Sequence, residues 1–207
     1  MTINLPETTA KRLPIYYRYL KNQLNCGKER ISSQEVSAAL HLDPGTVRKD
    51  FSNLGEFGRR GYGYDVAYLE RFIAHLMHHD QPLQVVFIGT VEFYQLICEN
   101  PLMLDEGYEG TAIFTTSQAE MKAGFAQLPL YALAELPAYA AGHAIDIAIL
   151  AVSTDLQNTA ESVVRAGIRA ILNCSTQVIR YPEDVSVQHV DILGELHTLS
   201  LRRIYTH

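Results

Sequence analysis

The pattern of hydrophobic and polar positions changes in character near residue 80. Before that point, apolar residues recur at intervals of three and four, which is the spacing of amphipathic helices. After it, short apolar runs rich in branched residues alternate with amphipathic segments, a pattern typical of strands buried on both faces of a parallel sheet. The chain is therefore predicted to have a helical N-terminal part and a C-terminal part in which strands and helices alternate.

The first helical pattern covers residues 7–25. Proline fits only the first turn of a helix, so Pro14 places the start of this helix at or near itself. Arg12, Arg18 and Lys21 lie off the apolar stripe. Isolated charges at helical spacing are usually exposed, and we expect these three to be solvated.

Two further helices are predicted between residues 31 and 54. Ser32 and Glu35 form the S-x-x-E pattern of a capping box at the start of the first of them. Asp43 followed by Pro44 gives the second an N-cap and a proline at its first position. The pair has the order of a helix-turn-helix.

The second of these helices has one buried and one free face. Val47, Phe51 and Leu54 recur at spacings of four and three and form the apolar stripe. The residues left facing outward are small or basic: Gly45, Thr46, Arg48, Lys49 and Ser52. This is the composition that a recognition helix presents to the major groove.

A glycine-rich hairpin is predicted at residues 57–64. Glycines permit a sharp reversal of the chain, and Arg59, Arg60 and Tyr62 alternate with them, so the segment resembles a wing whose side chains contact phosphates or the minor groove. Such a segment can also be an ordinary solvated turn, and capped helix pairs occur in domains that never touch nucleic acid. The order and proximity of the helices and the hairpin favour DNA binding.

The second part is predicted to be a doubly wound α/β domain of the Rossmann-like kind. Buried strands are expected at 83–88, 111–114, 145–151 and 168–172, with an edge strand at 187–192. Helices are expected at 91–104, 117–124, 131–140, 154–166 and 193–205. We expect a winged-helix domain at 1–80, a Rossmann-like domain at 81–191 and a C-terminal helix at 192–207.

Charge is distributed unevenly along the 207 residues. The whole chain carries −6, but residues 1–80 hold 11 Lys and Arg against 9 Asp and Glu, whereas residues 81–207 hold 6 against 14. The two parts are therefore +2 and −8. DNA affinity depends on the local footprint, so the overall acidity does not exclude a nucleic-acid partner.

The composition sets the expected compartment. The hydrophobic content of 47% is ample for packed cores, yet no apolar run approaches the length that spans a bilayer, and the N-terminus lacks a signal-peptide core. Cys26, Cys98 and Cys174 are widely separated and have no C-x-x-C spacing. We expect a cytoplasmic protein with reduced thiols, no membrane partner and no metal site.

The turn after the first predicted strand departs from the dinucleotide-binding pattern G-x-G-x-x-G. Gly89 supplies the first glycine, but Val91 and Tyr94 stand where the other two belong, and Glu92 adds negative charge. The second strand, which carries a ribose-binding acid in such folds, ends near Thr115 without a carboxylate. NAD(H) binding is therefore expected to be weak or absent.

The run VRKDFSNLGEFGRRGYGYDV, with AILAVSTDLQNTAESVVRAGIRAILN and VQHVDILGEL later in the chain, closely resembles the Rex family of redox-sensing transcriptional repressors. The likeness extends from about Leu13 to Leu199, and its most specific part is RKD-x-S-x-x-GEFG-x-RG-x-GYDV. The resemblance implies a homodimer that binds a palindromic double-stranded DNA operator, a Rossmann domain that senses NAD(H), and a C-terminal helix exchanged between subunits.

The resemblance also assigns roles to individual positions. Those carried over to DNA binding are Arg48, Lys49 and Ser52 on the recognition helix and Arg59, Arg60 and Tyr62 on the wing. Arg18 and Asp191 match family residues that link the DNA-binding and ligand-binding halves. The resemblance therefore favours a functional role for Arg18 over that of a solvated charge. The positions that depart from the family pattern, by contrast, fall on the nucleotide site. They are Val91, Tyr94, Thr115, Asn100 before Pro101, and Asn173–Thr176 in place of N-F-A-P.

Two functions remain open from the sequence. The leading hypothesis is a DNA-binding repressor of the Rex type with weakened or lost NAD(H) sensing. The alternative is a sensor that binds another small ligand or nucleotide in the Rossmann-like pocket, because crevices of such sheets commonly bind something. Catalysis is the weakest option, since no nucleophile with a paired base stands out.

Overall fold

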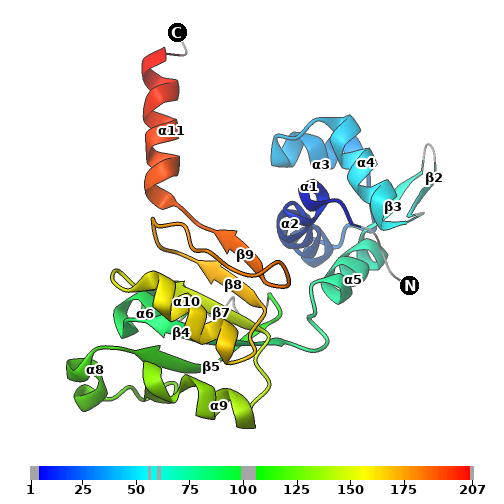
Figure 1. The fold of residues 1–207 in the computed structure, drawn as a ribbon. Helices are drawn as coiled ribbons and strands as arrows, with labels where there is room; N and C mark the ends of the chain where they lie inside the picture. The colour runs from blue at the N-terminus through cyan, green and yellow to red at the C-terminus, as the bar shows by residue number, and fades with distance from the viewer. Residues whose placement is uncertain (1–4, 56, 60–61, 99–105, 206–207) are drawn as a thin grey trace. The chain divides into compact units, whose positions relative to one another are not determined.

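The computed structural model describes residues 5–55, 57–59, 62–98 and 106–205, without the side chains of residues 58, 59, 97 and 98. The chain divides into two compact units, Met1–Gln81 and Pro82–His207. Figure 1 shows the elements of both. None of the helices in these ranges has the length and apolar content needed to span a bilayer.

The first unit is a winged helix-turn-helix. Its helices are α1 (Glu7–Ala10), α2 (Leu13–Asn25), α3 (Ser33–Leu40), α4 (Pro44–Leu54) and α5 (Val66–Leu76). Its strands are β1 (Arg30–Ile31), β2 (Gly58–Arg59) and β3 (Gly63–Asp65), which form an antiparallel sheet in the order β1-β3-β2. The opening helix is divided: α1 ends at Ala10, and α2 begins one residue before Pro14, as the proline predicts.

The helix starts follow the capping chemistry of the sequence. Ser32 accepts a hydrogen bond from the backbone of Glu35, whose carboxylate returns one to Ser32, so the capping box is complete. Asp43 accepts from the backbone N–H groups of Gly45 and Thr46 at the start of α4. Between α3 and α4 the chain reverses through His41, which has a φ of 53° and lies in the left-handed region.

One hydrophobic core holds the first unit together. Its fully covered members come from every helix from α2 to α5 and from β1, and include Tyr16, Leu20, Ile31, Val36, Val47, Phe51, Leu69 and Ile73. Phe51 of α4 contacts Tyr64 of β3 edge to face, with ring centroids 4.9 Å apart. The recognition helix and the wing strand therefore share one packing surface.

The second unit is built on a six-stranded parallel sheet with the order β6-β5-β4-β7-β8-β9. Its strands are β4 (Leu83–Gly89), β5 (Tyr108–Thr115), β6 (Leu130–Ala132), β7 (Ile147–Ala151), β8 (Ala170–Asn173) and β9 (Ser186–His189). Numbered along the chain, this is the order 3-2-1-4-5-6 of a Rossmann-type sheet. The predicted fold class is confirmed.

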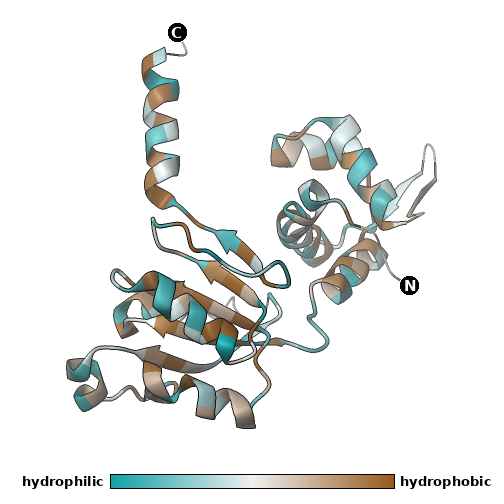
Figure 2. Ribbon diagram, viewed as in Figure 1, coloured by the Kyte–Doolittle hydropathy of each residue, from teal (hydrophilic) through white to brown (hydrophobic). Residues whose placement is uncertain are grey.

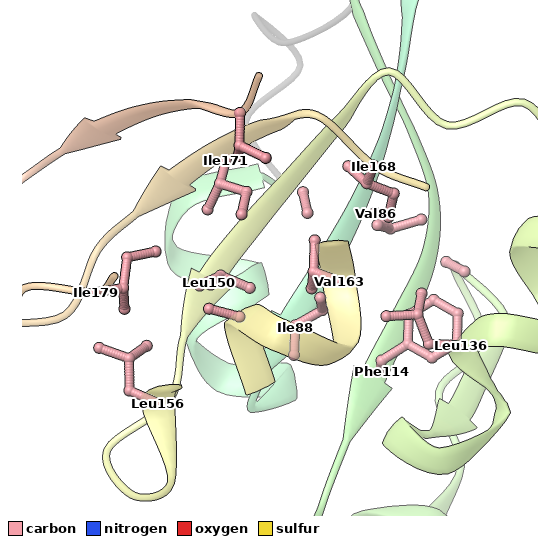
Figure 3. Packing of buried hydrophobic residues seen from close by; sticks show 14 residues of the cluster. Val86, Ile88, Phe114, Leu136, Leu150, Leu156, Val163, Ile168, Ile171 and Ile179 are labelled. Atoms are coloured by element: carbon pink, nitrogen blue, oxygen red, sulfur yellow. The ribbon is translucent and has the colours of Figure 1, made fainter. Parts of the chain in front are cut away.

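Helices cover both faces of this sheet. On one face, α9 (Leu136–Gly142) and α10 (Leu156–Arg165) pack against β4, β5, β7 and β8, and Figure 3 shows Val163 of α10 among Ile88, Leu150 and Ile171. On the other face, Tyr94 of α6 (Val91–Cys98) joins a cluster with Phe87, Ile113 and Ile149. The near-continuous apolar strands reflect this burial on both sides.

One segment of this unit differs from the predictions, and another is described only in part. Residues 131–140 were expected to form one helix, but they contain the edge strand β6, a 3₁₀ turn (Leu133–Glu135) and then α9. Pro137 explains the late start, because proline belongs in the first turn of a helix. The predicted helix 91–104 is described as α6 up to Cys98, and its remainder lies outside the described residues.

The last helix, α11 (Ile192–Tyr205), has no buried residue. Figure 2 shows hydrophobic and hydrophilic bands alternating along it. Its large apolar side chains are exposed by half or more of their surface: Ile192, Leu193, Leu196, Leu199, Leu201, Ile204 and Tyr205. A helix with this much exposed apolar surface lacks its packing partner within the single chain.

Candidate nucleic-acid interface and nucleotide site

The exposed face of α4 carries the residues expected to read DNA. Arg48, Lys49 and Ser52 are exposed, whereas Val47 and Phe51 on the same helix are fully buried. The positive charge of Arg48 acts on the hydroxyl of Tyr64: burial raises the Tyr64 pKa, and Arg48 opposes that rise.

A buried carboxylate fixes α4 to the start of the chain. Asp50 is 2% exposed, and its two oxygens accept hydrogen bonds from Thr9 (2.8 Å), from Tyr16 (2.6 Å) and twice from Arg12 (2.6 and 2.7 Å). Burial alone would raise the Asp50 pKa, but the hydrogen bonds from Arg12, Tyr16 and Thr9 outweigh it and lower the pKa. The expectation that Arg12 is solvated is therefore wrong.

The wing contains a cation–π pair that the sequence analysis did not identify. Tyr62 is 68% exposed, and the guanidinium carbon of Arg30 on β1 lies 4.8 Å from the centre of its ring. Arg30 also pairs with Asp65, at 3.8 Å. The register brings Arg30 opposite Asp65 across β1 and β3, and this pairing across a sheet has no signal at helical or short sequence spacing.

The remaining wing residues are described only in part. Arg59 lies on β2, opposite Gly63 of β3, and Arg60 lies outside the described residues. Gly63 has a φ of 74°, and a Cβ there would lie 2.7 Å from the Ile31 carbonyl oxygen, so only glycine allows β1 and β3 to approach this closely. Gly63 therefore has a structural role beside any contact with DNA.

The residues of the degenerate nucleotide loop lie at the carboxyl ends of β4 and β5. Gly89 ends β4 opposite Ala151, and a Cβ there would meet the Ala151 carbonyl oxygen at 2.7 Å, so this glycine is required by strand packing. Tyr94 is 8% exposed and lies between the rings of Phe87 and Phe125. Tyr94 is thus part of the core beneath α6.

An acidic side chain that sequence reasoning missed connects these strand ends. Glu120 of α8 (Gln118–Ala123) accepts hydrogen bonds from the backbone N–H of Val91 (3.0 Å) and from the hydroxyl of Thr115 (2.5 Å). Thr115 is 3% exposed. Glu92 adds a second carboxyl group, and a hydrogen bond from its own backbone N–H lowers the Glu92 pKa.

Arg18 and Asp191, the two residues expected to link the halves of the protein, belong to different units. Arg18 lies on the exposed side of α2. Asp191 precedes α11 and accepts a hydrogen bond from the backbone N–H of Gly194 at 3.0 Å, so it caps that helix. In the stretch that replaces N-F-A-P, Asn173 is fully buried and forms hydrogen bonds with Ser175, Gln177 and His189.

No group of three or more His, Cys, Asp or Glu side chains within the described ranges is arranged to hold a metal ion. The His75 imidazole instead lies 2.8 Å from Asp80, and the His79 ring packs against Tyr17 with centroids 4.5 Å apart. These histidines therefore have local partners.

A winged helix-turn-helix followed by a Rossmann-type sheet defines a two-domain transcription regulator. Residues 4–52 match the family model described as "Putative DNA-binding protein N-terminus". The redox-sensing transcriptional repressor Rex of Leuconostoc citreum (strain KM20) is 38% identical over 94% of this chain and 91% of its own. The Rex protein of Listeria welshimeri is 34% identical over 96% and 93%.

Solved structures show the same likeness. RSP in complex with β-NAD⁺ and operator DNA is 30% identical, with a TM-score of 0.89 over 98% of this chain and 94% of that one. RSP in complex with β-NADH is 27% identical, with a TM-score of 0.84 over 98% and 95%. The chain belongs to the Rex family of redox-sensing transcriptional repressors.

Proposed function

We propose that this protein binds a palindromic operator as a homodimer and represses transcription, with NAD(H) sensing weakened or lost. The observation that carries the DNA part is the exposed Arg48, Lys49 and Ser52 on a helix whose opposite face is buried and fixed by Asp50. A rigid helix that presents basic and small groups suits the major groove. DNA as the partner also makes the cytoplasm the expected compartment.

Arg48 and Lys49 supply base and phosphate contacts in this proposal, and Ser52 adds a hydroxyl one turn further along α4. Arg59, Arg60 and Tyr62 of the wing contact phosphates or the minor groove. Arginine suits paired contacts to guanine, and phosphate contacts fix the register of the protein on the duplex. Relatives of the chain are transcriptional repressors, and we propose no catalytic activity for it.

The experiment first recovers duplexes from a random pool by binding selection with the full chain, and then measures their affinity for variants. Arg48→Ala is expected to weaken binding by about 1–3 kcal/mol. Arg59→Ala is expected to weaken binding and to make the affinity less dependent on salt concentration. Arg71→Ala, which removes an exposed arginine of α5, is the control and should bind as the wild type does. Unchanged affinity for both Arg48→Ala and Arg59→Ala would refute the proposed interface.

Dimer formation through α11 is supported by its exposed apolar side chains. Ile192, Leu196 and Leu199 recur at spacings of four and three, so they lie on one side of the helix, and each is more than half exposed. A second copy of the chain would bury this stripe. Leu196→Glu combined with Leu199→Glu should give monomers in analytical ultracentrifugation, whereas His197→Glu, on another side of α11, should not.

Weak NAD(H) binding is supported by the residues at the strand ends. The dinucleotide does not fit them well: the Val91 N–H already has a carboxylate partner, Val91 and Tyr94 replace glycines of the loop, and Thr115 stands where an acid holds the ribose. Calorimetry with NADH at millimolar concentration should give little heat. Micromolar affinity would refute this part alone.

Arg18 and Asp191 stay proposed as the link between the two halves of the regulator. Asp191 caps α11, the helix proposed to hold the dimer, so a change at Asp191 reaches the dimer through α11. An alternative function is sensing of another small ligand at the same strand ends. A thermal-shift panel of nucleotides and coenzyme A fragments tests it, and stabilisation by one member would favour it.

A further inference from the structure

One carboxylate joins the ends of two neighbouring strands in the second unit. Glu120 Oε1 accepts from the Val91 backbone N–H at 3.0 Å, and Glu120 Oε2 accepts from the Thr115 hydroxyl at 2.5 Å. Val91 opens α6 two residues after the end of β4, and Thr115 is the last residue of β5. Because β4 and β5 pair in parallel, both donors lie at the same edge of the sheet.

These two positions are where a Rossmann-type sheet contacts a dinucleotide. The first N–H groups of the helix after the first strand face the pyrophosphate, and the end of the second strand holds the ribose. In this chain both positions are connected to a single side chain that carries the same sign of charge as a phosphate. The anion at the start of α6 is therefore supplied by the protein itself.

The position of Glu120 is fixed by the turn that precedes it. The Thr115 hydroxyl accepts from the Ser117 N–H at 3.0 Å, and the Ser117 hydroxyl accepts from the Glu120 N–H at 3.4 Å. The segment from the end of β5 to α8 is thus tied together by its own polar groups. Glu120 is partly buried there and is held close to both of its donors.

We propose that Glu120 is the specificity-determining residue at the carboxyl ends of β4 and β5, where it takes the place of a ligand phosphate and excludes phosphorylated ligands. This inference rests on the proposed loss of NAD(H) sensing and assigns that loss to a gained carboxylate, beside the lost glycines. An incoming pyrophosphate has to displace Glu120 from the Val91 N–H and meets the like charge of Glu92 as well.

Glu120 acts on anion binding in a different way from Val91 and Tyr94. Those two residues replace the glycines of the loop, and both remain in place when Glu120 alone is replaced. Removal of the carboxylate frees the N–H of Val91 and lowers the negative charge beside it. A gain of anion binding on this single change is therefore specific to Glu120.

The test measures binding of NADH and of inorganic pyrophosphate by calorimetry to wild-type protein and to Glu120→Ala and Glu120→Gln. We expect Glu120→Ala to bind pyrophosphate about tenfold or more tightly than the wild type, which corresponds to about 1.4 kcal/mol. Glu120→Gln keeps the size of the side chain but not its charge, so it should gain in the same direction and also covers the case in which Glu120→Ala does not fold.

Glu183→Gln is the charge-matched control. Its neighbour Asp184 pairs with Arg169, which precedes β8, so Glu183 lies near the opposite, amino-terminal edge of the parallel strands. It should bind both probes as the wild type does. If Glu120→Gln gains no more affinity than Glu183→Gln, the inference is wrong even though the proposed weak NAD(H) binding stands; tight NADH binding by the wild type would overturn both.

A second measurement needs no ligand. Thr115→Asp places a carboxylate against Glu120 in the wild type, so it should lower the unfolding temperature markedly, and it should do so much less in Glu120→Ala. Equal decreases in the two backgrounds would show that Glu120 does not contact Thr115 in solution, and would overturn the inference without bearing on DNA binding or NAD(H) affinity.

Discussion

The guanidinium of Arg12 donates two hydrogen bonds, of 2.6 and 2.7 Å, to the carboxylate of Asp50 and so connects the start of the chain to the recognition helix. Asp50 follows directly after Arg48 and Lys49, the proposed DNA contacts, but its own side chain is buried. The orientation of the exposed face of α4 thus depends on an ion pair on its hidden face.

Arg12→Ala should destabilise the winged-helix unit by about 2–4 kcal/mol, because it leaves a buried carboxylate without its cation. The value is somewhat below the range for a fully buried pair, since the Arg12 side chain is 25% exposed. Urea unfolding measures it. Lys11→Ala, which removes an exposed pair with Glu7, should leave the midpoint unchanged, and equal effects of the two would contradict a structural role for Arg12.

Acid should destabilise the same unit between about pH 4.5 and pH 2. The hydrogen bond from Lys28, followed by those from the backbone and hydroxyl of Ser32, lowers the pKa of Glu35 from 4.5 to about 2. A lowered pKa means that the stabilisation is present above the unfolded-state value and is lost as the pH falls through the folded-state value. The Asp50 pKa is lowered too, so it acts in the same direction.

Unfolding by urea across this pH range, monitored by circular dichroism, should show the decrease in the wild type and a weaker pH dependence in Glu35→Gln. Glu29→Gln removes an exposed carboxylate nearby in the sequence and should retain the wild-type profile. If the stability of Glu35→Gln falls with pH as steeply as that of the wild type, groups other than Glu35 cause the acid sensitivity.

Asp43→Ala should weaken both folding and operator binding. The Asp43 carboxylate bonds the N–H groups of Gly45 and Thr46 at 2.7 and 3.1 Å and thereby orders the first turn of α4. Loss of an N-cap costs about 1 kcal/mol. Thermal unfolding and DNA affinity measure the two effects. Asparagine caps as well as aspartate does, so Asp43→Asn should retain most of the stability and most of the DNA affinity. If Asp43→Asn binds DNA as weakly as Asp43→Ala does, the cap does not explain the effect of Asp43 on DNA binding.

Arg30 and Tyr62 should act on operator binding as a pair. The guanidinium of Arg30 lies over the Tyr62 ring, and an exposed cation–π contact contributes about 0.5–1 kcal/mol. Arg30→Ala and Tyr62→Ala should each reduce DNA affinity, and the double variant should lose less than the sum of the two. Strict additivity in this double-mutant cycle would show that Arg30 does not position the wing tyrosine.

Local chemistry made much of the fold predictable. The caps at Ser32 and Asp43 depend on side chains within three residues of the groups they bond, so the sequence alone reveals where α3 and α4 begin. The buried strands of the second unit were equally visible, because burial on both faces requires continuous apolar runs. The short edge strand β6 was missed, since three residues leave too little pattern.

The candidate site was predictable only where its residues lie on one element. Arg48, Lys49 and Ser52 share a face of one helix, and helical spacing exposes that face in the sequence. Glu120, by contrast, was overlooked as one acid in a short polar helix. Its partners, the Val91 N–H and Thr115, are 29 and 5 residues away, and only strand pairing brings them together.

The sequence by itself determined the two-part architecture, the family and the face of α4 that is free to meet DNA, because each is encoded by spacing or by contiguous motifs. Only the tertiary structure decided that Arg12 is an anchor, that Arg30 supports the wing, and that Glu120 fills the start of α6. These contacts join residues on separate elements. Packing and strand register decide which residues meet there, and short-range patterns in the sequence reveal neither packing nor register.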